Sequence, residues 1–231
     1  INIEDLIKDE KVIVTLTNKG YLKRMALSHY KAQKRGGKGI STQNTVEGDF
    51  VESMYTASTL ETLMIFTDKG KAYSLKVYEI PESGKQARGK LVENLINLSK
   101  DEKVERIIRI DSFDEQQEIF FLTKQGRAKM TNLSLFKNLN KSGIISIKLD
   151  DEDELIYVGL VSDEKDQIFV ATKLGYSIKF PCGNIRSMGR NTAGVKAITL
   201  RSGDEVVSGV IINNDELDIL TLTEKGYGKR R

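Results

Sequence analysis

The chain is poor in the residues that build disulfide frameworks and metal centres: its 231 residues include one cysteine, one histidine, two prolines and no tryptophan. A single Cys182 excludes an intramolecular disulfide and a multi-cysteine zinc site, and a single His29 leaves few metal or catalytic-triad arrangements. The five consecutive acids at residues 150–154 lack the glycine-containing alternation of an EF-hand loop. We therefore expect no catalytic residue and no metal site, with Cys182 a passive residue in a reducing compartment.

Long hydrophobic runs are also missing. The longest uncharged apolar stretches, such as residues 12–17, are far shorter than the ~20 residues of a membrane-spanning helix, which predicts a soluble protein. Leu, Ile, Val and Phe nevertheless make up about 29% of the chain, above the roughly 20% below which chains tend to stay disordered. Because the sequence starts at Ile1 without a signal pattern, we expect it to be a piece of a longer polypeptide.

A repeat runs through the chain. Five segments share an apolar strand, a threonine, a turn that ends in glycine, and a second strand; their turn glycines are Gly20, Gly70, Gly126, Gly175 and Gly226. These glycines are 50, 56, 49 and 51 residues apart. A tight hairpin needs a residue with positive φ at this point, which glycine adopts without steric cost, and the flanking runs are rich in β-forming residues. The pattern predicts hairpins.

Each unit also predicts two further strands. One opens at a second glycine 17–19 residues after the turn, namely Gly39, Gly89, Gly143 or Gly194, and the next covers residues 50–55, 104–110, 155–161 or 206–212. A four-stranded unit of ~50 residues cannot bury both faces, so copies must stack, and radial stacking makes a propeller. We predict one all-β domain with repeats at roughly 10–60, 61–115, 116–165 and 166–213 and a partial repeat at 214–231. The sequence leaves open whether blades are missing or an end strand is exchanged around the ring.

Charge is sorted by position within the repeat, although the formal net charge is only +3. Residues 18–46, 69–100, 124–148 and 173–203 hold 26 of the 36 lysines and arginines, whereas the intervening segments are acidic. Residues at one phase of a repeat share one rim of a ring, so we predict a basic band and a separate acidic band. A curved basic band suits a bent nucleic-acid duplex, because phosphate contacts can offset the energy of bending. The alternative is that both kinds of charge simply solvate loops.

The sharpest local feature is Gln33-Lys34-Arg35-Gly36-Gly37-Lys38-Gly39. Glycines interleaved with cations let backbone N–H groups approach a phosphate closely while the side chains neutralise it. The spacing of a nucleotide-binding P-loop is absent, because Lys38 is followed by Gly39 and Ile40. This segment predicts a phosphate-binding loop.

This heptapeptide resembles the Gln-Arg-Arg-Gly-Gly-Lys-Gly signature of the C-terminal domain of DNA gyrase A, with only Lys34 different. The Thr-x-Lys-Gly-Tyr turns and residues 189–195 are similar too, so the resemblance spans the chain. It implies a β-pinwheel, a propeller relative with strands exchanged between blades, that wraps DNA with positive handedness and presents it for ATP-dependent negative supercoiling. The related domain of topoisomerase IV, with a degraded signature, and a propeller scaffold for protein interactions remain alternatives.

The resemblance also implies a set of residues that contact DNA phosphates without reading bases. Besides the seven residues Gln33, Lys34, Arg35, Gly36, Gly37, Lys38 and Gly39, this set comprises Lys23, Arg24, Lys31, Lys71, Lys85, Arg88, Lys90, Arg127, Lys129, Lys137, Lys141, Lys179, Arg186, Arg190 and Lys196. DNA cleavage and the use of ATP and Mg²⁺ belong to other parts of such an enzyme, so this domain is expected to be non-catalytic and free of cofactors. Expected partners are duplex DNA and the rest of a bacterial, cytoplasmic, nucleoid-associated heterotetramer of gyrase A and gyrase B.

Overall fold

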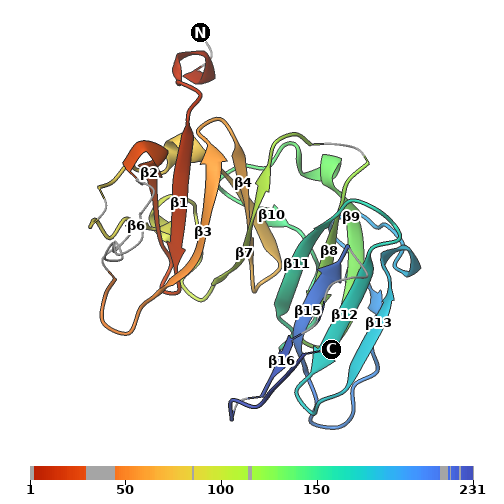
Figure 1. Cartoon of the computed structure of the whole chain (residues 1–231). Coiled ribbons are helices and arrows are strands. Elements are labelled where there is room, and N and C mark those ends of the chain that lie inside the picture. The colour runs from red at the N-terminus through yellow and green to blue at the C-terminus, as the bar shows by residue number, and fades with distance from the viewer. Residues whose placement is uncertain are drawn as a thin grey trace.

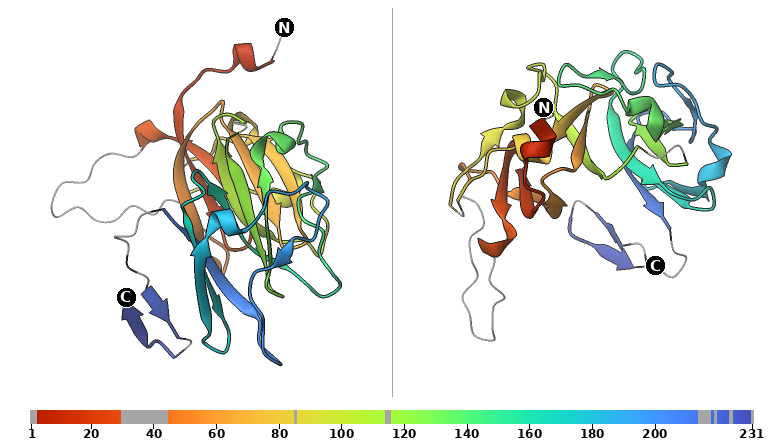
Figure 2. Two further views of the ribbon diagram at one scale, coloured as in Figure 1. Left: turned by 90° about the vertical axis from the view of Figure 1, so that its right-hand side faces the viewer. Right: turned by 90° about the horizontal axis from the view of Figure 1, so that it is seen from above.

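The computed structural model describes residues 3–29, 45–84, 86–113, 116–213, 218, 220–223 and 225–230. These residues form antiparallel sheets that follow one another along a curved path (Figures 1 and 2). The first sheet has the order β3(Val51–Ser58), β1(Lys11–Thr17), β2(Tyr21–Ala26), β6(Lys90–Leu91). The second has the order β7(Val104–Ile110), β4(Thr62–Thr67), β5(Lys71–Lys76), β10(Ile144–Ile145).

The later sheets repeat this arrangement. The third sheet has the order β11(Leu155–Val161), β8(Glu118–Thr123), β9(Arg127–Asn132), β14(Val195–Lys196), and the fourth has β15(Val206–Ile212), β12(Gln167–Thr172), β13(Ser177–Pro181). The hairpin β16(Leu220–Leu222) and β17(Gly228–Arg230) pairs only with itself among the described residues. Short 3-10 helices lie outside the strands: η1(Ile3–Leu6), η2(Leu27–His29), η3(Val77–Glu79), η4(Val92–Asn94), η5(Leu133–Phe136) and η6(Cys182–Asn184). The predicted all-β, propeller-like class is confirmed.

The outer strand of a blade comes from the repeat that follows it in sequence. β6 lies beyond β4 and β5 in the chain but pairs with β2, with Tyr21 opposite Leu91. In the same way β10 pairs with β5 and β14 pairs with β9. This arrangement confirms the exchange of strands between blades that the family resemblance implies.

Each hairpin turn is held by its threonine. The side-chain oxygen of Thr17, Thr67, Thr123 or Thr172 accepts a hydrogen bond from the backbone N–H four residues later, at 3.1 to 3.4 Å. All four threonines are buried, so these bonds are shielded from water. A threonine in this position therefore does more than favour a strand, because it also closes the turn by bonding the N–H of the residue after the glycine.

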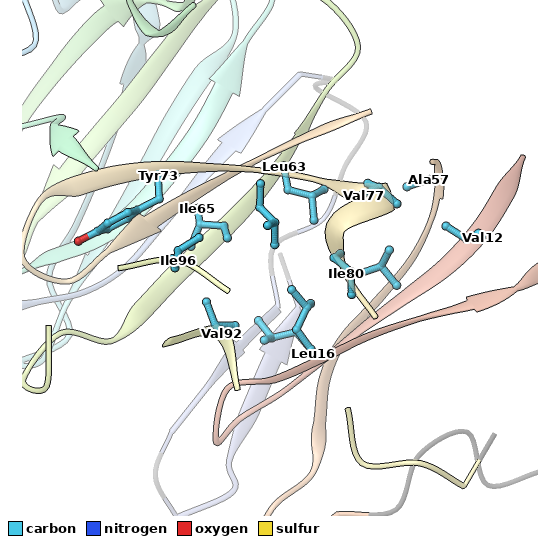
Figure 3. Close-up of a cluster of buried hydrophobic side chains, with 13 residues drawn as sticks. Val12, Leu16, Ala57, Leu63, Ile65, Tyr73, Val77, Ile80, Val92 and Ile96 are labelled. Carbon is cyan, nitrogen blue, oxygen red and sulfur yellow. The ribbon is translucent and has the colours of Figure 1, made fainter. Parts of the chain in front are cut away.

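The hydrophobic core lies between blades. Alternate residues of a strand point to opposite faces, and in β4 the side chains of Leu63 and Ile65 join the cluster shared with the first sheet (Figure 3), while those of Met64 and Phe66 join the cluster shared with the third. All four are fully buried. β4 and β8 are apolar on both faces because each is covered by a blade on either side.

One edge of each sheet faces the centre of the curve. β11 contacts both β7 and β15, and the Arg106 guanidinium of β7 lies 5.3 Å from the ring centroid of Tyr157 in β11. The Tyr157 hydroxyl in turn accepts a hydrogen bond from the Ile211 N–H of β15 at 3.1 Å. β3, β7, β11 and β15 are therefore the inner strands, and β6, β10 and β14 lie at the opposite, outer edge of their sheets.

Candidate nucleic-acid interface

The basic and the acidic segments of the sequence lie on different parts of the sheets. Each basic segment begins at the turn before β2, β5, β9 or β13, and three of them reach the exchanged strands β6, β10 and β14. Each acidic segment contains an inner strand: β3, β7, β11 or β15. We call β2, β5, β9, β13, the exchanged strands and the loops that join them the outer edge. Positive charge is concentrated there.

The loops of successive repeats touch one another along this outer edge. The Asn97 N–H of the second repeat donates to the Lys141 carbonyl of the third at 3.0 Å. The Lys148 N–H of the third repeat donates to the Thr192 carbonyl of the fourth, also at 3.0 Å. The cationic loops therefore form one connected band rather than separate patches.

Six of the expected phosphate contacts project from this edge with exposed side chains: Arg88, Lys90, Lys137, Lys179, Arg186 and Lys196. The Arg88 guanidinium lies 5.6 Å from the ring centroid of Tyr21, an arrangement that steadies the side chain without neutralising it. Arg190 is half-buried in the loop before β14. These residues come from three consecutive repeats.

Four other expected contacts are already engaged within the protein. Lys141 pairs with Glu79 at 2.7 Å, Lys71 with Glu102 at 3.6 Å and Arg24 with Glu82 at 3.6 Å. Arg127 donates from Nε to the Ala193 carbonyl at 3.1 Å and from Nη2 to the Gly194 carbonyl at 2.9 Å. Lys141, Arg24 and Arg127 join one repeat to the next, whereas Lys71 pairs within its own repeat. The positive charge of all four is partly neutralised or hydrogen-bonded within the fold.

The structure contradicts the expectation that Lys23 and Lys129 contact DNA directly. Both side chains are fully buried, with a relative exposure of 0%. Burial lowers the pKa of both lysines, and in Lys129, where nearby Arg190 adds repulsion, the pKa falls to about 8. Each ammonium is surrounded by backbone carbonyls of the next repeat, so neither can reach a phosphate on the surface.

The remaining expected contacts lie outside the described residues: Gln33, Lys34, Arg35, Gly36, Gly37, Lys38, Gly39, Lys31 and Lys85. Two cations that the sequence analysis did not single out do lie on the outer edge. Lys148 is exposed next to the loop of the fourth repeat, and the Arg201 guanidinium lies 4.1 Å from the ring centroid of Tyr176. Both follow an exchanged strand within a basic segment, which is the signal that could have identified them.

A cavity of about 520 Å³ near the hairpin turn of the first repeat has a mostly acidic lining from three repeats. Its charged residues are Glu52, Asp68, Glu93, Glu102, Glu105 and Glu154, together with Lys19 and Lys103. Although Glu105 is exposed at the surface, partial desolvation, reinforced by repulsion from Asp68 and Glu52, raises its pKa to about 7. The folded protein thus binds a proton at Glu105 more readily than the unfolded chain does.

Glu105→Gln should make the fold more stable at pH 8 and change it little at pH 5. Because the folded-state pKa is raised, the wild-type side chain contributes most to stability at low pH, and this contribution is lost as pH rises from about 4.5 to about 7. Thermal unfolding at the two pH values measures the difference. Glu164→Gln, which removes an exposed acid elsewhere, is the control, and an equal gain in both variants would contradict this explanation.

Cys182 and Tyr73 are packing residues. Cys182 is fully buried, and burial raises the pKa of its thiol to about 12, so the thiol stays protonated at neutral pH. Tyr73 is buried, and its hydroxyl donates to the Glu102 carboxylate at 2.9 to 3.0 Å.

In the described part of the chain, no helix has the length and apolar character needed to cross a membrane.

Fold and charge together define a class: an exchanged-strand propeller with a cationic outer edge. The chain belongs to the family described as DNA gyrase C-terminal domain, beta-propeller, whose model matches residues 11–58, 61–111, 117–162, 166–213 and 217–231. The described strands from β1 to β15 fall within or next to the first four of these matched segments. The resemblance expected from the heptapeptide and the turns is thereby confirmed at the level of the family.

Individual relatives agree with this assignment. The chain is 41% identical over 266 residues to the DNA gyrase A protein of Campylobacter jejuni, an alignment that covers 100% of the chain and 31% of the relative. The chain therefore spans about a third of that protein. A crystal structure of the C-terminal domain of DNA topoisomerase IV is similar with a TM-score of 0.84 and 29% identity, covering 97% of this chain and 68% of that one. A structure of the DNA gyrase A C-terminal domain gives a TM-score of 0.71 and 29% identity, covering 96% and 71%.

Proposed function

We propose that this chain binds and bends duplex DNA along its outer edge, as the DNA-wrapping domain of a gyrase A protein. The observation that carries the proposal is the connected outer band, in which loops from consecutive repeats touch and present exposed lysines and arginines. The inner strands β11 and β15 carry no charged residue and so offer a phosphate no cation. A duplex is therefore directed to one side of the curve.

Simple energetics support bending around this edge. Bending 20–30 base pairs by 40–90° costs on the order of 1–6 kcal/mol. Each lysine or arginine that neutralises a phosphate releases condensed counterions, and several such contacts together exceed this cost at moderate salt. Contacts to phosphates position the duplex without reading its bases, so we expect little sequence preference.

The role of the heptapeptide and the place of the domain in a larger enzyme are also proposals. We propose that the heptapeptide at residues 33–39, together with Lys31 and Lys85, adds phosphate contacts to the same band. The domain itself would need no cofactor, and the remainder of gyrase A, together with gyrase B, would supply DNA cleavage and the use of ATP and Mg²⁺. In that bacterial cytoplasmic assembly the domain would present a DNA segment for strand passage, which yields negative supercoils.

Duplex affinity should fall steeply with salt and rise with duplex length. Six phosphate contacts predict a slope of about −5 in a plot of log K against log[salt]. A duplex of about 40 base pairs should bind more tightly than one of about 15, because only the longer one can follow the curve. Fluorescence anisotropy over a salt series with both duplexes measures the two effects. An affinity that does not change with salt would refute the basic band. An affinity that does not change with duplex length would mean that DNA binds a local basic patch and does not bend around the outer edge.

A second candidate is the corresponding domain of a topoisomerase IV, which the TM-score of 0.84 favours. The nearly intact heptapeptide favours gyrase. Joining the chain to the remainder of a gyrase A protein, with gyrase B added, separates the two. Negative supercoiling of relaxed plasmid with ATP supports the gyrase function, and relaxation without supercoiling supports the alternative.

A further inference from the structure

One position of the repeat lies beneath the loop of the next repeat. The third residue after the turn glycine is Lys23 in β2, Tyr73 in β5 and Lys129 in β9. All three side chains are completely buried. A lysine that is 0% exposed needs several acceptors to offset its lost hydration, and the acceptors here are main-chain carbonyls.

The two lysines share one equivalent acceptor in the next repeat and differ in the second. Lys129 Nζ donates to the carbonyls of Gly189 and Arg190 at 2.9 and 2.6 Å, with Thr192 Oγ1 at 3.5 Å. Lys23 Nζ donates to the carbonyls of Gly84 and Ala87, both at 3.0 Å. Gly84 and Gly189 each stand five residues before the glycine that precedes the exchanged strand. The ammonium group is thus the centre around which each loop folds.

The position of these carbonyls fixes the direction of the neighbouring amides. In a trans peptide group the C=O and the following N–H point in opposite directions. Because the Gly189 and Arg190 carbonyls point to Lys129, the N–H groups of Arg190 and Asn191 point away from it. Among the described residues neither N–H donates to an acceptor. Two adjacent outward amides next to a guanidinium make a small anion-binding concavity.

We propose that Lys129 is a positioning residue for a backbone phosphate site formed by the N–H groups of Arg190 and Asn191. This inference rests on the proposed DNA-binding function and gives the buried Lys129 a role in it. The ligand is a phosphate group, carried by DNA or free in solution. Lys129 acts through the loop and does not touch the ligand.

Lys129→Met, which keeps an aliphatic stem and removes the ammonium, tests this inference in the 231-residue chain. We expect the affinity for a duplex of about 40 base pairs to fall about tenfold, the loss typical of one hydrogen bond to a charged group. Nuclear magnetic resonance of the wild-type chain should show downfield shifts of the Arg190 and Asn191 amide protons on adding the duplex, and these shifts should disappear in Lys129→Met.

Tyr73→Phe is the matched control. It alters the same strand position in the preceding blade and removes hydrogen bonds to Glu102 rather than to loop carbonyls, so we expect wild-type affinity. Inorganic phosphate is the second probe: amide shifts with phosphate alone identify an anion site, and shifts with duplex alone identify a site that needs the DNA backbone.

Two outcomes separate the failure of this inference from the failure of the function. Normal duplex binding without a shift of either amide in the wild-type chain overturns the inference and leaves the proposed function intact. Absence of duplex binding overturns both. The wild-type titration decides between these outcomes even if Lys129→Met does not fold.

Discussion

Replacing Lys137, Lys179, Arg186 and Lys196 together by alanine should weaken the binding of a duplex of about 40 base pairs by about a hundredfold or more near 0.1 M salt. The four side chains are exposed on the outer edge of consecutive repeats, and none has an ion pair or side-chain hydrogen bond within the described structure. Each lost phosphate contact should reduce the magnitude of the salt slope by about 0.9. Fluorescence anisotropy at four salt concentrations measures both quantities. Thermal stability should hardly change, because exposed charges contribute little to folding.

A charge-matched variant distinguishes location from net charge. Lys8, Lys11, Lys103 and Lys165 are also exposed, but they lie outside the four basic segments. Replacing these four by alanine removes the same charge and should leave affinity within about threefold of wild type, since exposed charges beyond the Debye length of ~10 Å are largely screened. If both variants lose affinity equally, binding depends on overall charge and the outer edge has no special role.

Gly194→Ala should destabilise the fold by about 3 kcal/mol or more. Gly194 has φ +79 and precedes the exchanged strand β14, and a Cβ there would lie 2.4 Å from the Ala128 carbonyl oxygen. The left-handed conformation alone costs a non-glycine residue roughly 1–2 kcal/mol. The clash with a backbone atom adds to this cost and forces β14 away from β9. Chemical denaturation measures the loss, and weaker duplex binding should accompany it because the loop that carries Arg190 ends at this glycine.

Gly175→Ala separates the cost of the left-handed backbone conformation from the cost of the steric clash. Gly175 has φ +86, and a Cβ at this position meets nothing within 4 Å. Only the conformational cost applies, so we expect a loss of about 1 kcal/mol. Equal losses in the two variants would mean that the close approach at Gly194, and with it the docking of the exchanged strand, contributes nothing to stability.

The strands could be predicted from the sequence because the signals for each strand lie within its own repeat. The expected strands at residues 104–110, 155–161 and 206–212 coincide with β7, β11 and β15, since apolar runs are bounded by clear turn signals. The partner of a two-residue strand such as β6 is different. Lys90 and Leu91 carry too little information to specify β2, and only the family resemblance implied the exchange.

The roles of individual cations were harder to predict. A lysine such as Lys129, flanked by Ala128 and Met130, has the pattern of an exposed strand residue. Its burial depends on carbonyls about 60 residues away in the sequence, which no local pattern contains. Lys141 and Glu79 form an ion pair across repeats for the same reason. Sequence position predicted where positive charge gathers, but the long-range contacts decide which charges stay available to a ligand.

The exchange of outer strands has a consequence for synthesis on the ribosome. A blade lacks its last strand until the following repeat has emerged from the ribosome. The outer edge of β9 therefore stays unpaired until β14 is synthesised, and that of β5 until β10 is synthesised. During translation the newest sheet therefore always has an open edge, the kind of edge that invites pairing with another chain. Each new repeat closes the edge left by its predecessor, so the order of translation is also the order in which the nascent domain becomes protected from aggregation.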